Sequence, residues 1–139
     1  MKKQKYISFV QNTGNIYVSN NYGNTWTGAG PSTQWNSIAI SASGQYQSAL
    51  ATGENIYISS DFGNTWTAKL TDGTRNWRSI SVSASGQYQT AVVYGGNIYI
   101  SSDFGNNWTP KQTNLTRNWF AVSLSASGQY QTEIGRAHV

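Results

Sequence analysis

Carboxylates are the side chains of this sequence that could perform acid–base or nucleophilic chemistry, since glycoside hydrolysis uses a pair of them across the substrate. The 139-residue chain has five: Glu54, Asp61, Asp72, Asp103 and Glu133. Asp61 and Asp103 recur at one place in a repeated octapeptide, and Glu133 lies in a C-terminal stretch that departs from the repeat. Only Glu54 and Asp72 remain as candidates for catalysis.

These two carboxylates are not kept by the other copies of the repeat. The position of Glu54 is taken by Gly14 and Gly96, and that of Asp72 by Asn114. A pair of acidic residues in facing positions is therefore not indicated. We expect that the chain has no catalytic residue and is not an enzyme.

Metal and cofactor sites are not predicted either. The sequence has no cysteine and a single histidine, His138, and its carboxylates are scattered, whereas metal sites need clustered ligands. The glycine pair in "YGGN" lies in a predicted hairpin turn and is not followed by a helix, so it does not indicate a phosphate-binding loop. We expect no metal and no cofactor.

The best candidates for ligand binding are arginine, amide and tryptophan side chains in a recurring loop. The sequence "TRNW" occurs twice, and the first copy reads "STQW". The residues are Gln34, Trp35, Arg75, Asn76, Trp77, Arg117, Asn118 and Trp119. Arginine forks and amides beside an aromatic ring suit a sugar or a peptide. The alternative is that each tryptophan fills space between structural units while each arginine is solvated.

The charge and hydropathy of the sequence argue against a nucleic-acid or membrane partner. The net charge is +4, only 10% of residues are charged, and the basic residues are dispersed, so no nucleic-acid partner is predicted. No apolar run is long enough to span a membrane, and the stretch after Lys3 is too short for a signal-peptide core. The sequence thus leaves the cellular compartment open.

The candidate residues belong to an internal sequence repeat of 42 residues. "SASGQYQ" begins at Ser41, Ser83 and Ser125. Residues 47–88 aligned with residues 89–130 give 28 identities in 42 positions. A fixed period of this length is typical of propeller blades and other repeat folds.

Each repeat divides into strand-like pieces joined by turns. Around Trp77 these pieces are residues 77–83, 88–94, 98–101 and 108–112, and the first alternates apolar and polar residues. No ten-residue stretch shows helical periodicity. The sequence predicts an all-β fold of β-propeller blades, each with four short antiparallel strands.

The octapeptide lies in the turn between the third and fourth strand of each unit. Its Asp or Asn can accept backbone hydrogen bonds, its glycine gives conformational freedom, and its tryptophan anchors the turn. We interpret these residues as structural: Ser19, Asn21, Gly23, Trp26, Ser59, Asp61, Gly63, Trp66, Ser101, Asp103, Gly105 and Trp108. Asn21 keeps an acceptor oxygen without charge, a change that a catalytic carboxylate would not tolerate.

This octapeptide resembles the Asp-box, or BNR repeat, S-x-D-x-G-x-x-W, of sialidase-like and sortilin-like propellers. The resemblance covers residues 6–132 and departs from the pattern at Asn21. It implies a propeller, but says little of function, because the box lies away from the active site in the enzymes that carry it. Sialidases also use an arginine cluster and a tyrosine nucleophile with a glutamate partner. Here Arg75, Arg78 and Arg117 lack acidic partners.

Alignment of the repeats predicts three circularly permuted units over residues 5–132, at about 5–46, 47–88 and 89–130. The chain then begins and ends at the second strand of a unit, which leaves two sheet edges open. The last residues, 133–139, read "EIGRAHV" and break the repeat abruptly. They match a translated sequencing-library adapter, so we interpret this tail as an artefact of an assembled metagenomic sequence and the chain as a truncated fragment. The alternative is a genuine divergent tail.

The predicted function is a non-catalytic binding or scaffold module that presents repeated loops on one face to a glycan or a protein. The alternative is a fragment of a sialidase-like or other propeller glycosidase whose catalytic carboxylates lie in further blades. Two chains could also complete one propeller ring as a homo-oligomer, since propellers need roughly four to eight blades.

Overall fold

The computed structural model describes residues 5–113 and 117–137, and for residue 137 it describes the backbone alone. Residues 114–116, in one of the predicted ligand loops, and the last two residues of the predicted tail lie outside the described residues. The described chain consists of strands joined by turns, without a helix. The strands are β1 (Ile7–Val10), β2 (Gly14–Ser19), β3 (Thr27–Thr33), β4 (Trp35–Ile40), β5 (Gln47–Ala51), β6 (Ile56–Ser59), β7 (Thr67–Lys69), β8 (Trp77–Val82), β9 (Gln89–Gly96), β10 (Ile98–Ser101), β11 (Thr109–Lys111), β12 (Arg117–Leu124) and β13 (Gln131–Ala137).

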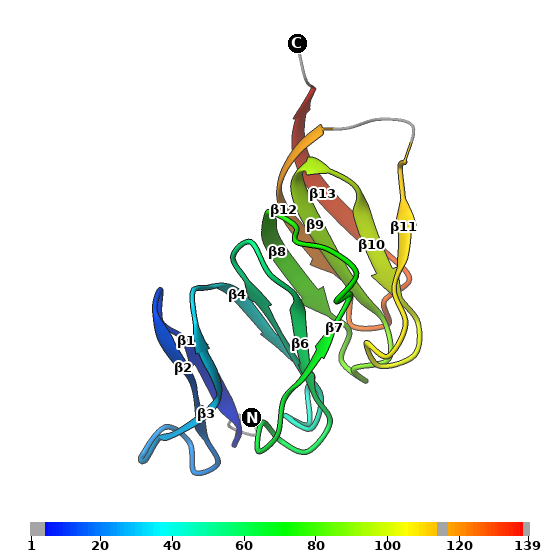
Figure 1. The fold of residues 1–139 in the computed structure, drawn as a ribbon. Helices are drawn as coiled ribbons and strands as arrows, with labels where there is room; N and C mark the ends of the chain where they lie inside the picture. Colours follow the sequence, from blue (N-terminus) through cyan, green and yellow to red (C-terminus); the bar gives the residue numbers. More distant parts are fainter. Residues whose placement is uncertain (1–4, 114–116, 138–139) are drawn as a thin grey trace.

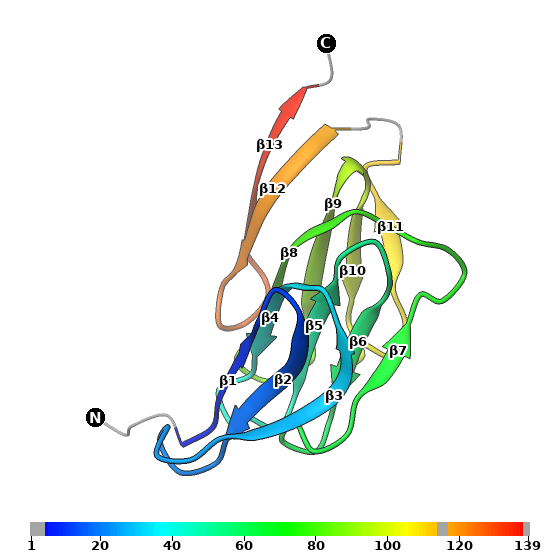
Figure 2. The same ribbon diagram turned by 60° about the vertical axis from the view of Figure 1, so that its left-hand side comes forward.

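The strands form a row of small antiparallel sheets (Figure 1). One sheet has the order β1-β2-β3 and the next the order β4-β5-β6-β7. The order β8-β9-β10-β11 repeats that arrangement, and the pair β12–β13 joins this sheet through β9, which gives six strands in all. The sheet of β1–β3 and the β12–β13 pair lie apart from each other in both views (Figure 1, Figure 2). The chain is a partial β-propeller with an open arc of blades.

The strands β8 to β11 match the pieces expected around Trp77 to within one residue at each end, except that β9 runs two residues further, to Gly96. This extension pairs with the start of β12, through Arg117 opposite Gly96 and Asn118 opposite Tyr94. The predicted "GGN" turn therefore contributes backbone to a contact between neighbouring units.

A register shift follows the tryptophan at or near the start of the first strand of each unit. It lies between Trp35 and Ser37, between Trp77 and Ser79, and between Trp119 and Ala121. Such a bulge bends the strand and re-aims its side chains. The tryptophan points into the interior, at 3%, 0% and 9% exposure in the three copies, while the residue after it faces outward.

The core lies between successive sheets, because the two faces of each strand pack on two different neighbours. In β5, Ala49 packs with Ile16 of the preceding sheet, whereas Leu50 packs with Trp77 and Ile80 of the following sheet. A strand covered on both faces reads as a continuous apolar run, and β5 and β9 are buried along most of their length.

Buried polar side chains join the sheets as well. Gln89 is 1% exposed; its Oε1 accepts a hydrogen bond of 2.6 Å from Ser48 of the preceding unit, and its Nε2 donates to the carbonyl of Gly86. Ser8 and Gln47 repeat this contact at 2.6 Å. Because both partners are paired, the amide can be buried at little cost.

A tyrosine of each unit lies over a glycine of the next. A β-carbon placed on Gly86 would come within 2.6 Å of the Tyr46 side chain, and the φ of this glycine is 87°. Tyr46 also contacts Phe104 in the next octapeptide turn, with ring centroids 4.5 Å apart. Tyr6 and Phe62 make the equivalent contact at 4.6 Å. Only glycine permits this approach, so the "SASGQY" spacing encodes the contact between units.

Candidate functional site

The octapeptide turn is a closed set of hydrogen bonds. In the second copy, the Ser59 hydroxyl donates to Asp61 Oδ1 at 2.8 Å and accepts from the Gly63 N–H at 2.9 Å. Asp61 also accepts from the backbone N–H and the hydroxyl of Thr65, at 2.9 and 2.6 Å. The Trp66 indole donates to the carbonyl of Gly63 at 3.0 Å. Asp61 thus closes the turn through hydrogen bonds from Ser59 and Thr65.

These hydrogen bonds keep the aspartates ionised. Partial desolvation opposes ionisation of Asp61, but hydrogen bonds from Thr65 and Ser59 outweigh it and hold its pKa below the ordinary value of 3.8. Hydrogen bonds from the backbone and side chain of Asn107 hold the pKa of Asp103 below that value too. Asn21 makes the same turn without charge, since its Oδ1 accepts from Thr25 N–H at 2.9 Å.

The predicted ligand loops lie at the other end of the sheets from the octapeptide turns, since consecutive hairpins of an antiparallel sheet point in opposite directions. Here the Trp77 indole donates to the carbonyl of Glu54 in the preceding unit at 3.2 Å. Trp35 and Trp119 donate likewise to the carbonyls of Gly14 and Gly96, at 2.8 and 3.1 Å. Because these rings are buried, a ligand at this end would contact arginine and amide groups instead of indole faces.

Arg75 is occupied by contacts within the chain. Its Nε donates to the Tyr99 hydroxyl at 3.0 Å, and one terminal nitrogen donates to Asp72 at 3.0 Å. The other terminal nitrogen donates to the carbonyls of Leu70 and Gly73. Burial opposes its charge, yet the hydrogen bonds that the guanidinium donates to Tyr99 and Asp72 raise the pKa of Arg75 above its ordinary value. The guanidinium therefore folds the loop onto Tyr99 and leaves little for a ligand.

The other predicted residues of this rim are more open. Gln34 and Asn76 are exposed. Their backbone carbonyls accept hydrogen bonds from the backbone N–H groups of Thr52 and Tyr94, at 2.7 and 2.8 Å, respectively. Arg117 and Asn118 lie at the start of β12 and are half-buried. The Oδ1 of Asn118 is buried and has no hydrogen-bond partner among the described residues. The structure thus gathers these side chains at one end of the blades without joining them in one pocket.

Three further residues at this end were not among those predicted to bind a ligand. The Arg78 guanidinium lies over the Tyr94 ring, 4.9 Å from its centroid, and Tyr94 meets Phe120 edge to face at 5.5 Å. Phe120 is 44% exposed. Arg78 and Phe120 each follow a buried tryptophan, so their outward direction follows from strand alternation and the bulge. The position directly after a buried tryptophan is therefore the sequence signal that indicates an outward-facing side chain at Arg78 and Phe120.

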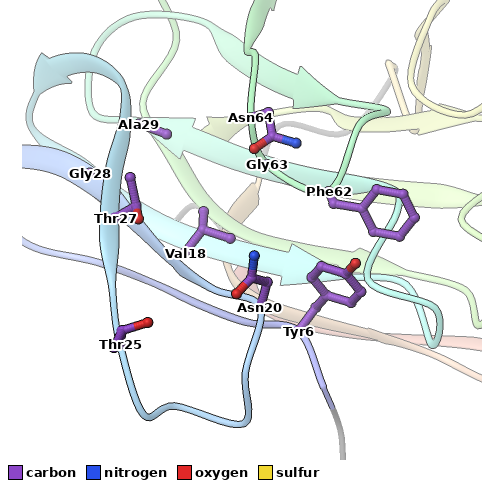
Figure 3. A pocket seen from close by; sticks show the side chains of 10 residues that line it. All are labelled: Tyr6, Val18, Asn20, Thr25, Thr27, Gly28, Ala29, Phe62, Gly63 and Asn64. Atoms are coloured by element: carbon purple, nitrogen blue, oxygen red, sulfur yellow. The ribbon is translucent and has the colours of Figure 1, made fainter.

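The described residues also form two hollows, both on the octapeptide side. The first has a volume of about 250 Å³ and lies between the first and second octapeptide turns (Figure 3). Its lining consists of Tyr6, Val18, Asn20, Thr25, Thr27, Gly28, Ala29, Phe62, Gly63 and Asn64. The stacked rings of Tyr6 and Phe62 form one wall, and Asn20 and Asn64 lie beside them (Figure 3). None of these side chains is charged.

The second hollow is the same feature one repeat later. It has a volume of about 300 Å³ and is lined by Tyr46, Ile58, Ser60, Thr65, Thr67, Lys69, Phe104 and Asn106. Tyr46, Phe104 and Thr67 stand where Tyr6, Phe62 and Thr27 stand in the first. We call the two hollows the inter-turn grooves. No sequence motif indicates these grooves, because each groove is built by two neighbouring units.

Clusters of three or more potential metal ligands are absent from the described part of the chain. Nor do residues 5–113 and 117–137 contain a helix that is long and apolar enough to cross a membrane.

Comparison with known proteins places the fold. A family model named Sortilin-Vps10, described as sortilin, neurotensin receptor 3, matches residues 14–135. A search of curated proteins gave no match. Among solved structures, a GH74 xyloglucanase from Xanthomonas campestris is similar at a TM-score of 0.68 and 16% identity, over 94% of this chain and 24% of the xyloglucanase.

Two further structures are of YCF48. The protein from Cyanidioschyzon merolae matches at a TM-score of 0.61 and 13% identity, over 98% of this chain and 43% of that one. The structure of YCF48 bound to D1 peptide matches at a TM-score of 0.63 and 18% identity, over 84% of this chain and 41% of that one. The chain thus spans less than half the length of these proteins. The similarities confirm the predicted all-β propeller fold and, at these identities, the fold alone.

Proposed function

Because the chain belongs to the Sortilin-Vps10 family of Asp-box propellers, we propose that it is a non-catalytic binding module that holds a neutral glycan in its inter-turn grooves. One observation carries the proposal. Equivalent residues form the same groove, with the same aromatic wall, at two successive junctions between units. A ligand with a repeating chemical structure gains affinity when identical sites on one rigid body engage it together.

The chemistry of the first groove favours an uncharged, hydroxyl-rich ligand. Its wall is the Tyr6–Phe62 pair, and an aromatic face suits the apolar side of a sugar ring. The side chains of Asn20 and Thr27 make no hydrogen bond to the described residues, and both line the groove. They supply amide and hydroxyl groups that can exchange hydrogen bonds with sugar hydroxyls. The second groove differs by one charge, that of Lys69.

The absence of a catalytic role is supported by the occupation of the carboxylates. Asp61 and Asp103 close turns, Asp72 pairs with Arg75 at 3.0 Å, and Glu54 accepts a hydrogen bond from Thr33 at 2.9 Å. A general acid or nucleophile needs a carboxylate directed at a substrate and paired with a second one across it. Incubation with xyloglucan and aryl glycosides is expected to release no product.

The test is a titration of the chain with neutral oligosaccharides, followed by tyrosine and tryptophan fluorescence and by NMR shifts. Asn20→Ala with Thr27→Ala removes the unpaired polar groups of one groove, and we expect affinity to fall about three- to tenfold. Thr52→Ala, in an exposed hairpin at the other end of the blades, is the matched control and leaves affinity unchanged. Loss of binding with Arg78→Ala, while Asn20→Ala with Thr27→Ala binds normally, would move the site to the opposite rim.

A second candidate is a fragment of a propeller glycosidase. The similarity to the GH74 xyloglucanase favours it, since that enzyme shares the blade geometry over 94% of this chain. In that case the loops at the Arg78–Tyr94–Phe120 end would bind the polysaccharide, and the catalytic carboxylates would lie in blades outside this sequence. Binding of xyloglucan that depends on Phe120 and not on Asn20 would support this alternative.

A further inference from the structure

The two inter-turn grooves differ in charge at one position. In the second groove this position is Lys69 of β7, and in the first it is Ala29 of β3 (Figure 3). Each pairs with an isoleucine of the neighbouring strand, Ala29 with Ile16 and Lys69 with Ile56. The two residues therefore occupy the same register in successive units, and the second groove has an ammonium group where the first has a methyl group.

The ammonium group of Lys69 has no counter-charge in the described part of the chain. Its side chain forms no ion pair and no hydrogen bond with residues 5–113 and 117–137. Other groups hold four of the five carboxylates, those of Glu54, Asp61, Asp72 and Asp103. Lys69 is half-buried and lines the groove. A cation that lines a hollow without a partner attracts an anionic ligand.

The neighbours of Lys69 suit a sugar ring. One wall of the groove is the pair of Tyr46 and Phe104, whose ring centroids are 4.5 Å apart. Such an aromatic face suits the apolar side of a sugar. The hydroxyls of Ser60 and Thr67 also line the groove and make no hydrogen bond to the described residues. A hydroxyl both donates and accepts, so these two groups can pair with sugar hydroxyls.

We propose that the second groove selects for an acidic sugar unit and that Lys69 is its specificity-determining residue. The inference rests on the proposed function for the glycan itself. It adds that an otherwise neutral glycan binds more tightly when the unit in this groove carries a carboxylate or a sulfate. A phosphate monoester has a charge of roughly −1.5 to −2 at neutral pH, and the lining of the groove has no second cation to balance it. One ammonium group matches a substituent with a single negative charge.

A lysine on an edge strand has another common role, which is to prevent pairing between strands of different molecules. Lys111 of β11 stands in the same register as Lys69, opposite Ile98. It is exposed and lines neither inter-turn groove, whereas Lys69 is half-buried at the second one. Lys111 therefore provides a matched control that has the charge and the strand position of Lys69 without the groove.

The test compares three probes by titration calorimetry. They are a β-1,4-linked glucose oligosaccharide, the same oligosaccharide with one unit oxidised to a carboxylate, and the same with one unit sulfated. We expect the acidic probes to bind about three- to tenfold more tightly than the neutral one. Lys69→Ala should reduce their affinity to that of the neutral probe, whereas Lys111→Ala should leave the preference intact. Added salt should weaken the preference, because screening reduces electrostatic attraction.

A transfer of the charge tests the assignment in the opposite direction. Ala29→Lys, introduced together with Lys69→Ala, should restore the preference for the acidic probes, since Ala29 has the same register and lines the first groove. The chain itself has alanine in one unit and lysine in the next at this position, so both substitutions should be compatible with the fold. Unchanged thermal melting curves check this.

Binding of the neutral probe separates this inference from the proposed function. The inference alone is overturned if the neutral probe binds and the acidic probes bind no more tightly. The same holds if Lys111→Ala removes the preference as fully as Lys69→Ala, because the attraction would then come from the overall charge. If no probe binds, both proposals are overturned. A short peptide with one glutamate that binds through Lys69 more tightly than the acidic oligosaccharides would overturn the assignment to a sugar.

Discussion

Single side chains of the Asp-box decide how the stability of the chain responds to acid. Asp61 and Asp103 have pKa values below 3.8 in the folded chain, so the unfolded chain binds more protons as the pH approaches that value. The stabilising contribution is complete above the unfolded pKa and is lost as the pH falls through the folded pKa. Asn21 shows that an asparagine also closes the turn, which makes the Asn variant a suitable comparison.

We therefore predict that Asp61→Asn with Asp103→Asn folds, but loses part of the acid dependence of its stability. The difference in unfolding free energy between the original chain and this variant should be constant at neutral pH and shrink below about pH 4. Urea denaturation at several values between about pH 6 and pH 3 measures it. A difference in unfolding free energy that stays constant down to the lowest pH would mean that the charges of the turn carboxylates contribute nothing to stability.

Glycine positions offer a second prediction at the scale of the residue. Gly86→Ala places a β-carbon 2.6 Å from the Tyr46 side chain at a φ of 87°, and both the clash and the backbone strain destabilise the fold. Gly53 is the control, since its φ is 68° but no atom lies within 4 Å of a β-carbon there. We expect Gly53→Ala to cost about 1–2 kcal/mol and Gly86→Ala about 1–3 kcal/mol more, by chemical denaturation. Equal losses at both positions would contradict the packing role of Gly86.

At the scale of the element, the strand that opens a unit is fixed to the preceding unit through its tryptophan. Trp77→Phe keeps an aromatic ring but leaves the Glu54 carbonyl without its indole donor. We expect a loss of about 1–3 kcal/mol in unfolding free energy. Trp26→Phe is the comparison, because Trp26 is 39% exposed and its indole makes no hydrogen bond to the described residues. A loss as large at Trp26 as at Trp77 would show that ring size, and not the hydrogen bond, decides.

The extent of the strands was accessible from the sequence because each carries local information. The alternation in "WRSISVS" and the turn glycines gave the boundaries around Trp77 to within about two residues, as expected for boundaries read from pattern. The extension of β9 to Gly96 was not accessible. It depends on pairing with Arg117 of the next unit, a contact that no local pattern encodes.

The candidate site was less accessible for the same reason. Sequence spacing brought attention to Arg75, but not to the loop geometry that directs its guanidinium to Tyr99 and Asp72. The inter-turn grooves arise where Tyr6 of one unit meets Phe62 of the next. A motif search reads one unit at a time and cannot find a surface that two units share.

At the scale of the whole molecule, stability should vary along the row of sheets. Repeat proteins gain stability from contacts between nearest neighbours, so a strand covered on both faces is better protected than a terminal one. We predict that the amides of β5 and β9 exchange most slowly with deuterium and those of β13 among the fastest, by NMR or mass spectrometry. Equal protection of β13 and β5 would contradict it.

The tyrosine that lies over a glycine has a consequence for inheritance. Each complete unit presents its tyrosine to the unit that follows and its glycine and phenylalanine to the unit that precedes. Any unit is therefore a suitable neighbour for any other. Unequal recombination between the similar repeats of the gene would add or delete one blade in frame and keep the contacts that all units share. The number of blades encoded by such a gene can therefore change by one at a time. The 28 identities in 42 positions between residues 47–88 and 89–130 fit a duplication of this kind.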